Sequence, residues 1–240
     1  MAKISAGSYD LNKWLYGGYE TDIITTIYGP AGSGKTNFCV LASVSQAKKG
    51  KKVIFIDTEG GFSTDRFKQI SGENFQEELK NILLLKPTNF YEQKKIFDSL
   101  LKQINNSIGL IIVDGITMLY RLEIGDALKQ ENDFKVKQAN FELARQLRTL
   151  AEIARNKNIP VLVTNQVYYE FLSDEEFREG KEKTARMVGG DLLKYWSKCL
   201  IELKQINNKR TAVLKKHRSL PEKELQFVIV QEGIRKKGLF

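Results

Sequence analysis

Histidine and cysteine are scarce in the 240-residue chain, and long apolar runs are absent. Because His217 is the only histidine, we expect a structural residue there rather than a catalytic triad or a histidine cluster. Cys39 and Cys199 lack the spacing of a metal site, and we expect buried free thiols, which fit a reducing cytoplasm. No stretch approaches the roughly 18 apolar residues of a membrane span, and residues 1–8 lack the apolar segment of a secretory signal. The sequence therefore indicates a cytoplasmic protein without a membrane partner.

The overall composition is that of a soluble globular protein, with 42% hydrophobic and 28% charged residues. A chain of this length is ordinary for one α/β domain. We therefore expect residues 1–240 to form a single domain, with residues 1–22 as a short lead-in, and we find no internal repeat.

The net charge of +9 is unevenly placed along the chain. Residues 181–240 hold 15 Lys and Arg against 6 Asp and Glu, whereas residues 1–180 hold 23 of each. A basic C-terminal third favours a polyanion partner, with nucleic acid foremost. A solvated basic face is the other interpretation, and charge alone does not separate the two.

The clearest signal is a strand–loop–helix pattern that begins at Ile23. The β-branched run 23–28 predicts a buried strand, and the helix is expected from Thr36 to about Lys49. Glycines between them let consecutive backbone N–H groups point inward as a cradle for a triphosphate. Lys35 supplies a positive charge for the β and γ phosphates, and Thr36 supplies a hydroxyl for Mg²⁺. The motif G-x-x-x-x-G-K-[ST] and the residue after it make up the predicted nucleotide site: Gly29, Pro30, Ala31, Gly32, Ser33, Gly34, Lys35, Thr36 and Asn37.

Three further apolar strands end in polar residues. Residues 52–56 lead into Asp57-Thr58-Glu59, residues 109–113 lead into Asp114, and residues 159–164 lead into Asn165-Gln166. In open α/β sheets, ligand chemistry gathers at the carboxyl ends of the strands. Asp114 has the Walker B form, and we expect it to hold Mg²⁺ through water.

The remaining patterns complete an α/β fold. Residues 81–86 predict one more strand, and helices are expected over 64–80 (interrupted near Ser71-Gly72), 89–105 and 134–158. Two polar stretches, residues 120–133 and 168–188, predict mobile loops. The expected architecture is a mostly parallel central sheet flanked by helices, with antiparallel C-terminal strands at 198–204, 209–215 and 225–230.

The order and spacing of these motifs resemble the RecA/RadA recombinase family, and most closely its short archaeal paralogue. The resemblance rests on residues 29–36, Asp57-Thr58-Glu59-Gly60, Asp114 and Asn165-Gln166, and it covers nearly the whole chain. Supporting runs are residues 4–8, Gly189-Gly190-Asp191 and residues 216–222. The resemblance implies a RecA-like P-loop NTPase fold, ATP and Mg²⁺ as ligands, and DNA as a partner.

The same resemblance assigns roles within the nucleotide site. It implies that Glu59 activates the attacking water and that Gln166 senses the γ-phosphate, so that Lys35, Glu59 and Gln166 form the catalytic set. Arg66 matches an arginine that stacks on adenine, and Pro221 matches a residue that caps ATP from a neighbouring subunit. A solvent-facing glutamate at position 59 and an ordinary surface arginine at position 66 are the alternatives.

Two loops that bind DNA in the family correspond to residues 120–138 and 168–188, with Arg121 and Arg186 as candidates for phosphate contact. Carboxylates in the same loops would repel a DNA backbone. We therefore also expect DNA contacts, with single strands favoured, from basic residues of the C-terminal strands: Lys209, Arg210, Lys215, Lys216 and Arg218.

The chain departs from the recombinases in ways that bear on assembly. Their N-terminal helix-hairpin-helix domain and aromatic tether have no counterpart in the matched region, and Leu83 and Leu85 stand where the tether is received. We therefore expect a monomer, dimer or small assembly rather than a long filament. The expected function is an ATP-dependent DNA-binding accessory protein of homologous recombination and DNA repair, with weak ATPase activity, that modulates the main recombinase and contacts other repair proteins.

Two alternatives stay open. A KaiC-like signalling ATPase shares this core and acts through protein partners without DNA. A non-hydrolysing scaffold would bind nucleotide and DNA while Glu59 contributes little. DNA affinity separates the first alternative from the expected function, and the turnover of a Glu59→Gln variant separates the second.

Overall fold

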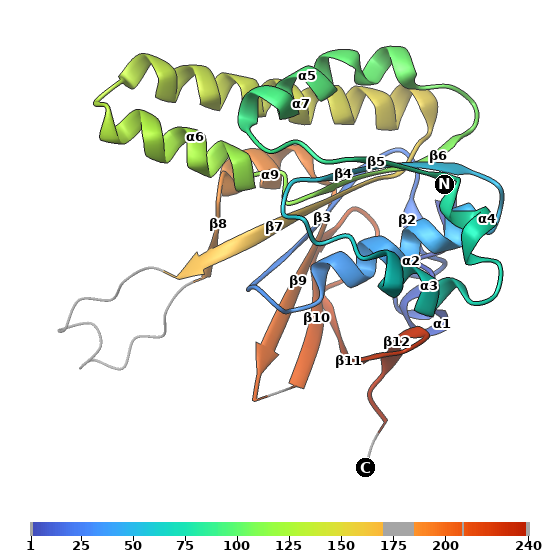
Figure 1. The fold of residues 1–240 in the computed structure, drawn as a ribbon. Helices are drawn as coiled ribbons and strands as arrows, with labels where there is room; N and C mark the ends of the chain where they lie inside the picture. The colour runs from blue at the N-terminus through green and yellow to red at the C-terminus, as the bar shows by residue number, and fades with distance from the viewer. Residues whose placement is uncertain (1, 170–184, 208, 239–240) are drawn as a thin grey trace, which may run out of the picture.

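The computed structural model describes residues 2–169, 185–207 and 209–238. The central feature is a large sheet, in which five strands run parallel in the spatial order β3-β7-β6-β4-β5 (Figure 1). These strands are β3 (Ile24–Gly29), β7 (Val161–Tyr169), β6 (Ile108–Asp114), β4 (Lys52–Asp57) and β5 (Ile82–Leu85). Their carboxyl ends meet at one edge of the sheet, as expected for the predicted site.

The C-terminal strands extend this sheet on the β3 side. β9 (Cys199–Ile206) pairs parallel with β3, and β10 (Lys209–His217), β11 (Lys223–Val230) and β12 (Gly233–Lys236) follow in antiparallel register. The short β8 (Ala185–Met187) pairs antiparallel with the end of β7. The predicted parallel sheet with an antiparallel C-terminal extension is therefore confirmed, and β12 is an additional strand.

Helices cover both faces of the sheet (Figure 1). β4 shows why, because Val53 and Phe55 are buried in the core against α2 (Lys35–Ala47), whereas Ile54 and Ile56 are buried in the core against α7 (Asp133–Lys157). Residues of α1 (Tyr9–Trp14) and α3 (Thr64–Ser71) also pack in the first core, and α4 (Phe75–Leu79) follows α3 in the sequence. Residues of α5 (Phe90–Gln103) and α9 (Gly190–Trp196) pack in the second core.

Residues 2–22 pack into the same core as the chain that follows them. β1 (Lys3–Ile4) precedes α1 in the sequence and β2 (Tyr19–Glu20) follows it, and the two strands pair to form a separate two-stranded sheet. Leu11, Leu15 and Tyr19 are buried in the same core as α2. The expected lead-in is thus packed against α2, and the expected burial of both cysteines is confirmed.

The predicted loop at residues 120–133 is wrong, because the segment is helical. α6 (Met118–Lys129) covers most of it, and Asn132 begins α7 by accepting a hydrogen bond from the backbone N–H of Lys135. Only Leu119 and Ala127 of α6 are buried, while Leu122 and Leu128 are exposed. Its apolar residues therefore lie all around the helix, and no 3.6-residue stripe marks it in the sequence.

The second predicted loop, residues 168–188, is bordered by strands. Residues 168 and 169 end β7, residues 185–187 form β8, and residues 170–184 lie outside the described residues. Among the helices that the structure describes, none is both long and apolar enough to cross a membrane.

Candidate nucleotide-binding and hydrolysis site

The phosphate-loop motif connects β3 to α2 and is held against the C-terminal strands. A methyl group at Gly29 would lie 2.3 Å from the carbonyl oxygen of Leu203 in β9, so only glycine fits that approach. Gly34 caps α2 with a φ of 107°, a left-handed conformation that strains any other residue. The loop therefore has the backbone conformation that the motif predicts, with the N-terminus of α2 directed at its centre.

Lys35 lies inside this loop with only 6% of its surface exposed. Its Nζ donates hydrogen bonds to the carbonyl oxygens of Gly29 (3.1 Å) and Pro30 (2.9 Å). Burial lowers the pKa of Lys35, while the carboxylates of Glu59 and Asp114 act in the opposite direction. The ammonium group is thus poorly solvated and close to two carboxylates, which suits it to a phosphate ligand.

Asp114 is fully buried at the end of β6 and is held by two hydroxyl groups. Thr36 Oγ1 donates to Asp114 Oδ2 (2.7 Å), and Thr164 Oγ1 donates to Asp114 Oδ1 (2.6 Å). Burial raises the pKa of Asp114 to about 6. A bound cation would favour its ionised form. The structure therefore brings together Thr36 and Asp114, the two residues predicted to serve Mg²⁺.

This donor set suits Mg²⁺ rather than a metal that needs a protein cage. Among the described residues, no group of three or more histidine, cysteine, aspartate or glutamate side chains could hold a metal ion. Mg²⁺ commonly takes one or two protein oxygens and completes its shell with phosphate oxygens and water. One hydroxyl and one carboxylate at the mouth of a phosphate loop match that requirement.

Glu59 and Gln166 come from different strands and meet at the edge of the sheet. Gln166 Nε2 donates a hydrogen bond of 3.0 Å to Glu59 Oε2. Gln166 is also the register partner of Gly29, the first residue of the phosphate loop. A methyl group at Gly115 would lie 2.6 Å from Cγ of Glu59, so Glu59 packs directly over the backbone that follows Asp114.

The neighbours of these residues have structural tasks. Asp57 accepts hydrogen bonds of 3.0 Å from the backbone N–H groups of Gly61 and Phe62, which shapes the turn that carries Glu59. Asn165 accepts from the hydroxyl of Thr117 and donates to the carbonyl oxygen of Val188 (2.8 Å). The segment that leads into α9 is therefore tied to the tip of β7.

Arg66 and Asn37 contact each other at one side of the loop. Arg66 Nε donates to Asn37 Oδ1 (2.7 Å), and its terminal nitrogens donate to the carbonyl oxygens of Val230 (2.9 Å) and Gln231 (3.0 Å). These bonds use the edge of the guanidinium group, whereas stacking on adenine would use its face. Arg66 therefore also joins α3 to the turn between β11 and β12.

The basic residues predicted to contact DNA do not form one surface. Because β10 runs antiparallel to β9, Lys209 and Arg210 lie at the site end of the sheet, and Lys215, Lys216 and Arg218 lie at the opposite end. Pro221 is exposed beyond that far end, so a contact with ATP requires a neighbouring subunit. Arg121 is exposed on α6, and the side chain of Arg186 lies outside the described residues.

Three of these residues are engaged within the chain. Lys215 forms an ion pair with Glu222, and Lys216 Nζ donates to the carbonyl oxygens of Lys194 (2.7 Å) and Ser197 (2.9 Å) at the end of α9. Arg218 pairs with Asp22 and with the buried carboxylate of Glu20. Their internal contacts weigh against a primary role in DNA binding.

Sequence reasoning missed one residue of the site. Thr164 fixes the carboxylate of Asp114, and it also accepts a hydrogen bond of 2.7 Å from the backbone N–H of Gly115. The sequence contains a signal for Thr164, because this residue ends the predicted strand 159–164 and lies next to Asn165-Gln166.

Comparisons with known proteins show which family the chain belongs to. The family model described as Rad51 matches residues 1–237. The chain is 42% identical to the DNA repair and recombination protein RadB of Methanocaldococcus jannaschii, over 93% of this chain and 98% of that protein. It is 40% identical to the protein of the same name from Methanobrevibacter smithii, over 93% and 92% of the two chains. A crystal structure of the RadB recombinase superposes with a TM-score of 0.77 at 33% identity, covering 98% of this chain and 100% of that one. The chain belongs to the Rad51 family and, within it, to the RadB proteins.

Proposed function

We propose that the chain is a DNA-binding ATPase of homologous recombination and DNA repair, in which nucleotide binding controls DNA affinity. The observation that carries this proposal is the hydrogen bond between Glu59 and Gln166 beside the phosphate loop. It joins the residue suited to activate water to the residue suited to sense the γ-phosphate. The names of the RadB relatives, which refer to DNA repair and recombination, support the cellular role.

The side chains divide the work of ATP hydrolysis among them. Lys35 would bind the β and γ phosphates, and Thr36 and Asp114 would hold Mg²⁺, which would supply positive charge against the phosphates. Glu59 accepts a proton from the attacking water through the carboxylate oxygen that Gln166 leaves free. Lys35 must give up or share its hydrogen bonds to the loop carbonyls before it can bind phosphate, and Glu59 must do the same with the Gln166 amide before it can act on water. These existing contacts support a slow turnover.

Gln166 is placed to transmit the nucleotide state. It lies on β7, which continues to residue 169 and pairs with β8 on the far side of residues 170–184. The resemblance predicts that those residues belong to the second DNA loop of the recombinase family, and this prediction lies outside the described residues. A phosphate oxygen that draws the Gln166 amide away from Glu59 would move the end of β7 and so alter the loop's contact with DNA.

The proposal extends to assembly and partners. Because Lys215, Lys216 and Arg218 make polar contacts within the chain, we propose Lys209, Arg210 and Arg121 as the main contacts for single-stranded DNA; Lys209 and Arg121 are exposed, and Arg210 is half-buried. We propose a monomer, dimer or small assembly in the cytoplasm that modulates the main recombinase. A KaiC-like signalling role through protein partners alone would require that DNA change neither ATP turnover nor ATP affinity.

The test is ATP turnover measured with and without single-stranded DNA, for the wild-type chain and for Lys35→Ala. We expect slow turnover that DNA accelerates, and loss of ATP binding in the variant because the buried ammonium group is removed. Turnover that DNA leaves unchanged, together with no DNA binding at low salt, would contradict the proposal and favour the signalling role.

A further inference from the structure

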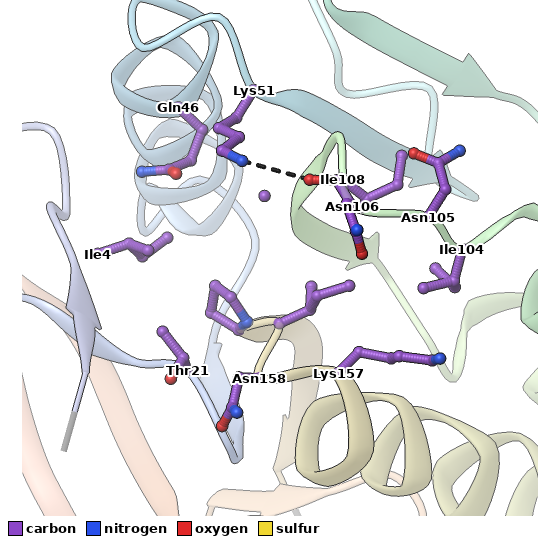
Figure 2. Close-up of a pocket in the computed structure, with 13 residues that line it drawn as sticks. Ile4, Thr21, Gln46, Lys51, Ile104, Asn105, Asn106, Ile108, Lys157 and Asn158 are labelled. Carbon is purple, nitrogen blue, oxygen red and sulfur yellow. Dashed lines mark hydrogen bonds between the residues drawn. The ribbon is translucent and has the colours of Figure 1, made fainter.

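A pocket of about 420 Å³ lies at the end of the sheet opposite to the nucleotide site. Most of its lining residues precede or begin strands β4, β6 and β7, and Ile4 of β1 and Thr21 after β2 complete the wall (Figure 2). The predicted nucleotide site lies at the other ends of these strands. β4 has six residues, so the two sites are separated by roughly 20 Å of strand. A pocket of this volume is large enough for one nucleotide.

The surface around the pocket is strongly basic. Three of its lining segments, residues 46–52, 102–109 and 155–160, contain seven lysine or arginine residues and no aspartate or glutamate, whereas Thr21 on the remaining wall is flanked by Glu20 and Asp22, which pair with Arg218. The seven are the four lysines of the first segment together with Lys102, Arg155 and Lys157, and all are exposed. None of them forms an ion pair with a carboxylate in the described part of the chain. Their charge is therefore available to an external anion.

Lys51 and Lys157 approach the pocket from different elements. Lys51 follows α2 and its Nζ donates to the carbonyl oxygen of Asn106 (3.2 Å), while Lys157 is the last residue of α7 (Figure 2). A methyl group at Gly109 would lie 2.7 Å from Cβ of Lys51 and 3.2 Å from Oε1 of Gln46. The missing side chain at position 109 is therefore what lets Lys51 and Gln46 reach the wall of the pocket.

Amide side chains supply hydrogen-bonding groups between the cations. Asn105, Asn106 and Asn158 line the pocket, together with Gln46 from the last turn of α2. Gln46 is only 3% exposed, and its amide nitrogen has no hydrogen-bond partner among the described residues. A buried amide that lacks a partner is a costly feature in a pocket wall. Asparagine and glutamine amides bind both phosphate oxygens and base edges.

We infer that this basic pocket is a second nucleic-acid contact, in which the lysines bind the phosphate backbone of a strand and one nucleotide enters the pocket. Seven cations spread over three segments exceed what a single small phosphate can neutralise, and they suit a polymer with regularly spaced charges. The inference rests on the proposed DNA-binding function and extends it. The chain would hold one strand at the nucleotide end of the sheet and a second strand at the opposite end.

The test compares two double variants that remove the same charge. Lys51→Gln with Lys157→Gln changes the pocket, and Lys13→Gln with Lys95→Gln is the control, because these two exposed lysines lie outside the pocket and outside its three basic segments. Single-strand affinity is measured by fluorescence anisotropy across a salt series. We expect the pocket variant to lower the slope of log K against log salt by about 1.4, since each phosphate contact contributes about 0.7, and the control to leave it unchanged.

A second measurement reports where the DNA lies on the protein. Cys39 and Cys199 are buried, so a cysteine introduced by Asn106→Cys is the accessible thiol of the described chain, with Lys95→Cys as its control. A thiol-reactive oligonucleotide should cross-link to the first variant and not to the second. If the pocket variant and the wild type bind DNA with the same slope, or if both cysteines cross-link equally, this inference is wrong while the proposed function stands.

Two remaining outcomes are also decisive. If the wild-type chain binds no DNA, the proposed function fails, and the inference fails with it. If tripolyphosphate raises the melting temperature of Lys35→Ala but not of Lys35→Ala combined with the two pocket substitutions, while the wild type and the pocket variant bind DNA equally, the pocket serves a small phosphate compound and the nucleic-acid inference is overturned.

Discussion

Gln166 Nε2 donates to Glu59 Oε2 across 3.0 Å, and this contact joins the tips of two strands that are not neighbours in the sheet. β6 lies between β4 and β7, so the two side chains meet above the strand that ends in Asp114. In the proposed function this hydrogen bond would couple hydrolysis to DNA binding, and it lies above Asp114, the residue expected to serve Mg²⁺. Any group that competes for the amide of Gln166 also changes the environment of the Glu59 carboxylate.

Glu59→Gln should lower ATP turnover at least 100-fold, because the amide cannot accept a proton from water. ATP affinity should change little, since Lys35 and Thr36 are intact. Glu73→Gln is the matched control, because Glu73 is an exposed glutamate in the turn between α3 and α4. Phosphate release and equilibrium ATP binding measure the two effects. Equal turnover in wild type and Glu59→Gln would show that another group activates the water.

Gln166→Ala should separate nucleotide binding from DNA binding. The alanine cannot donate to a phosphate oxygen or to Glu59, so the strand end of β7 no longer responds to the nucleotide. We expect the variant to bind ATP and DNA, with DNA affinity that is the same with and without ATP. Anisotropy with labelled single strands measures this difference. A nucleotide effect of wild-type size in the variant would place the coupling elsewhere.

Arg218→Ala should destabilise the fold by about 3 kcal/mol, because it leaves the carboxylate of Glu20 buried without its cation. Arg218 Nε lies 2.7 Å from Glu20 Oε2, and Glu20 is almost fully buried. Lys215→Ala, which removes an exposed ion pair with Glu222, should cost less than about 1 kcal/mol. Urea denaturation measures both. Equal stability of the two variants would mean that Arg218 is free for another task, such as DNA binding.

His217 should make the fold less stable in acid. Burial lowers the pKa of His217, and its Nδ1 accepts from the backbone N–H of Ser219 (3.2 Å), which requires the neutral ring. Below a pH of about 6.5 the unfolded chain binds a proton that the folded chain resists, so the free energy of unfolding falls as the pH is lowered.

The variant His217→Asn isolates this contribution, since an asparagine oxygen can still accept from Ser219. Between pH 7 and pH 5, wild-type stability should decline more steeply than that of the variant, as measured by thermal or urea unfolding at each pH. Parallel pH profiles would show that the pKa of His217 is the same in the folded and unfolded chains, with the carboxylate of Glu20 at 3.9 Å offsetting the effect of burial.

Most of the nucleotide site could be predicted because each of its residues follows a buried strand. The apolar runs before Gly29, Asp114 and Asn165 predicted parallel strands, and parallel strands bring their carboxyl ends to one edge. The hydrogen bonds between side chains at the ends of different strands could not be predicted in the same way. The bonds of Asp114 to Thr36 and Thr164 depend on the sheet order β3-β7-β6-β4, which the periodicity of single strands does not contain.

The predictions for DNA contact were weaker for a physical reason. Charge counts treated Lys209 and Arg218 as one basic group, whereas the antiparallel course of β10 places them at opposite ends of the sheet. The basic pocket was missed because its lysines come from three segments that no motif connects. The sequence predicts a loop over residues 120–133 because the segment that forms α6 has no apolar stripe.

The most direct test of the central claim is DNA affinity as a function of nucleotide. Binding of a labelled single strand is measured by anisotropy at several salt concentrations, with no nucleotide, with ATP and Mg²⁺, and with the Lys35→Ala variant as control. We predict salt-sensitive binding that changes at least tenfold on addition of ATP to the wild type and does not change in the variant. Absence of binding at low salt, or equal binding with and without ATP in the wild type, would contradict nucleotide-controlled DNA binding.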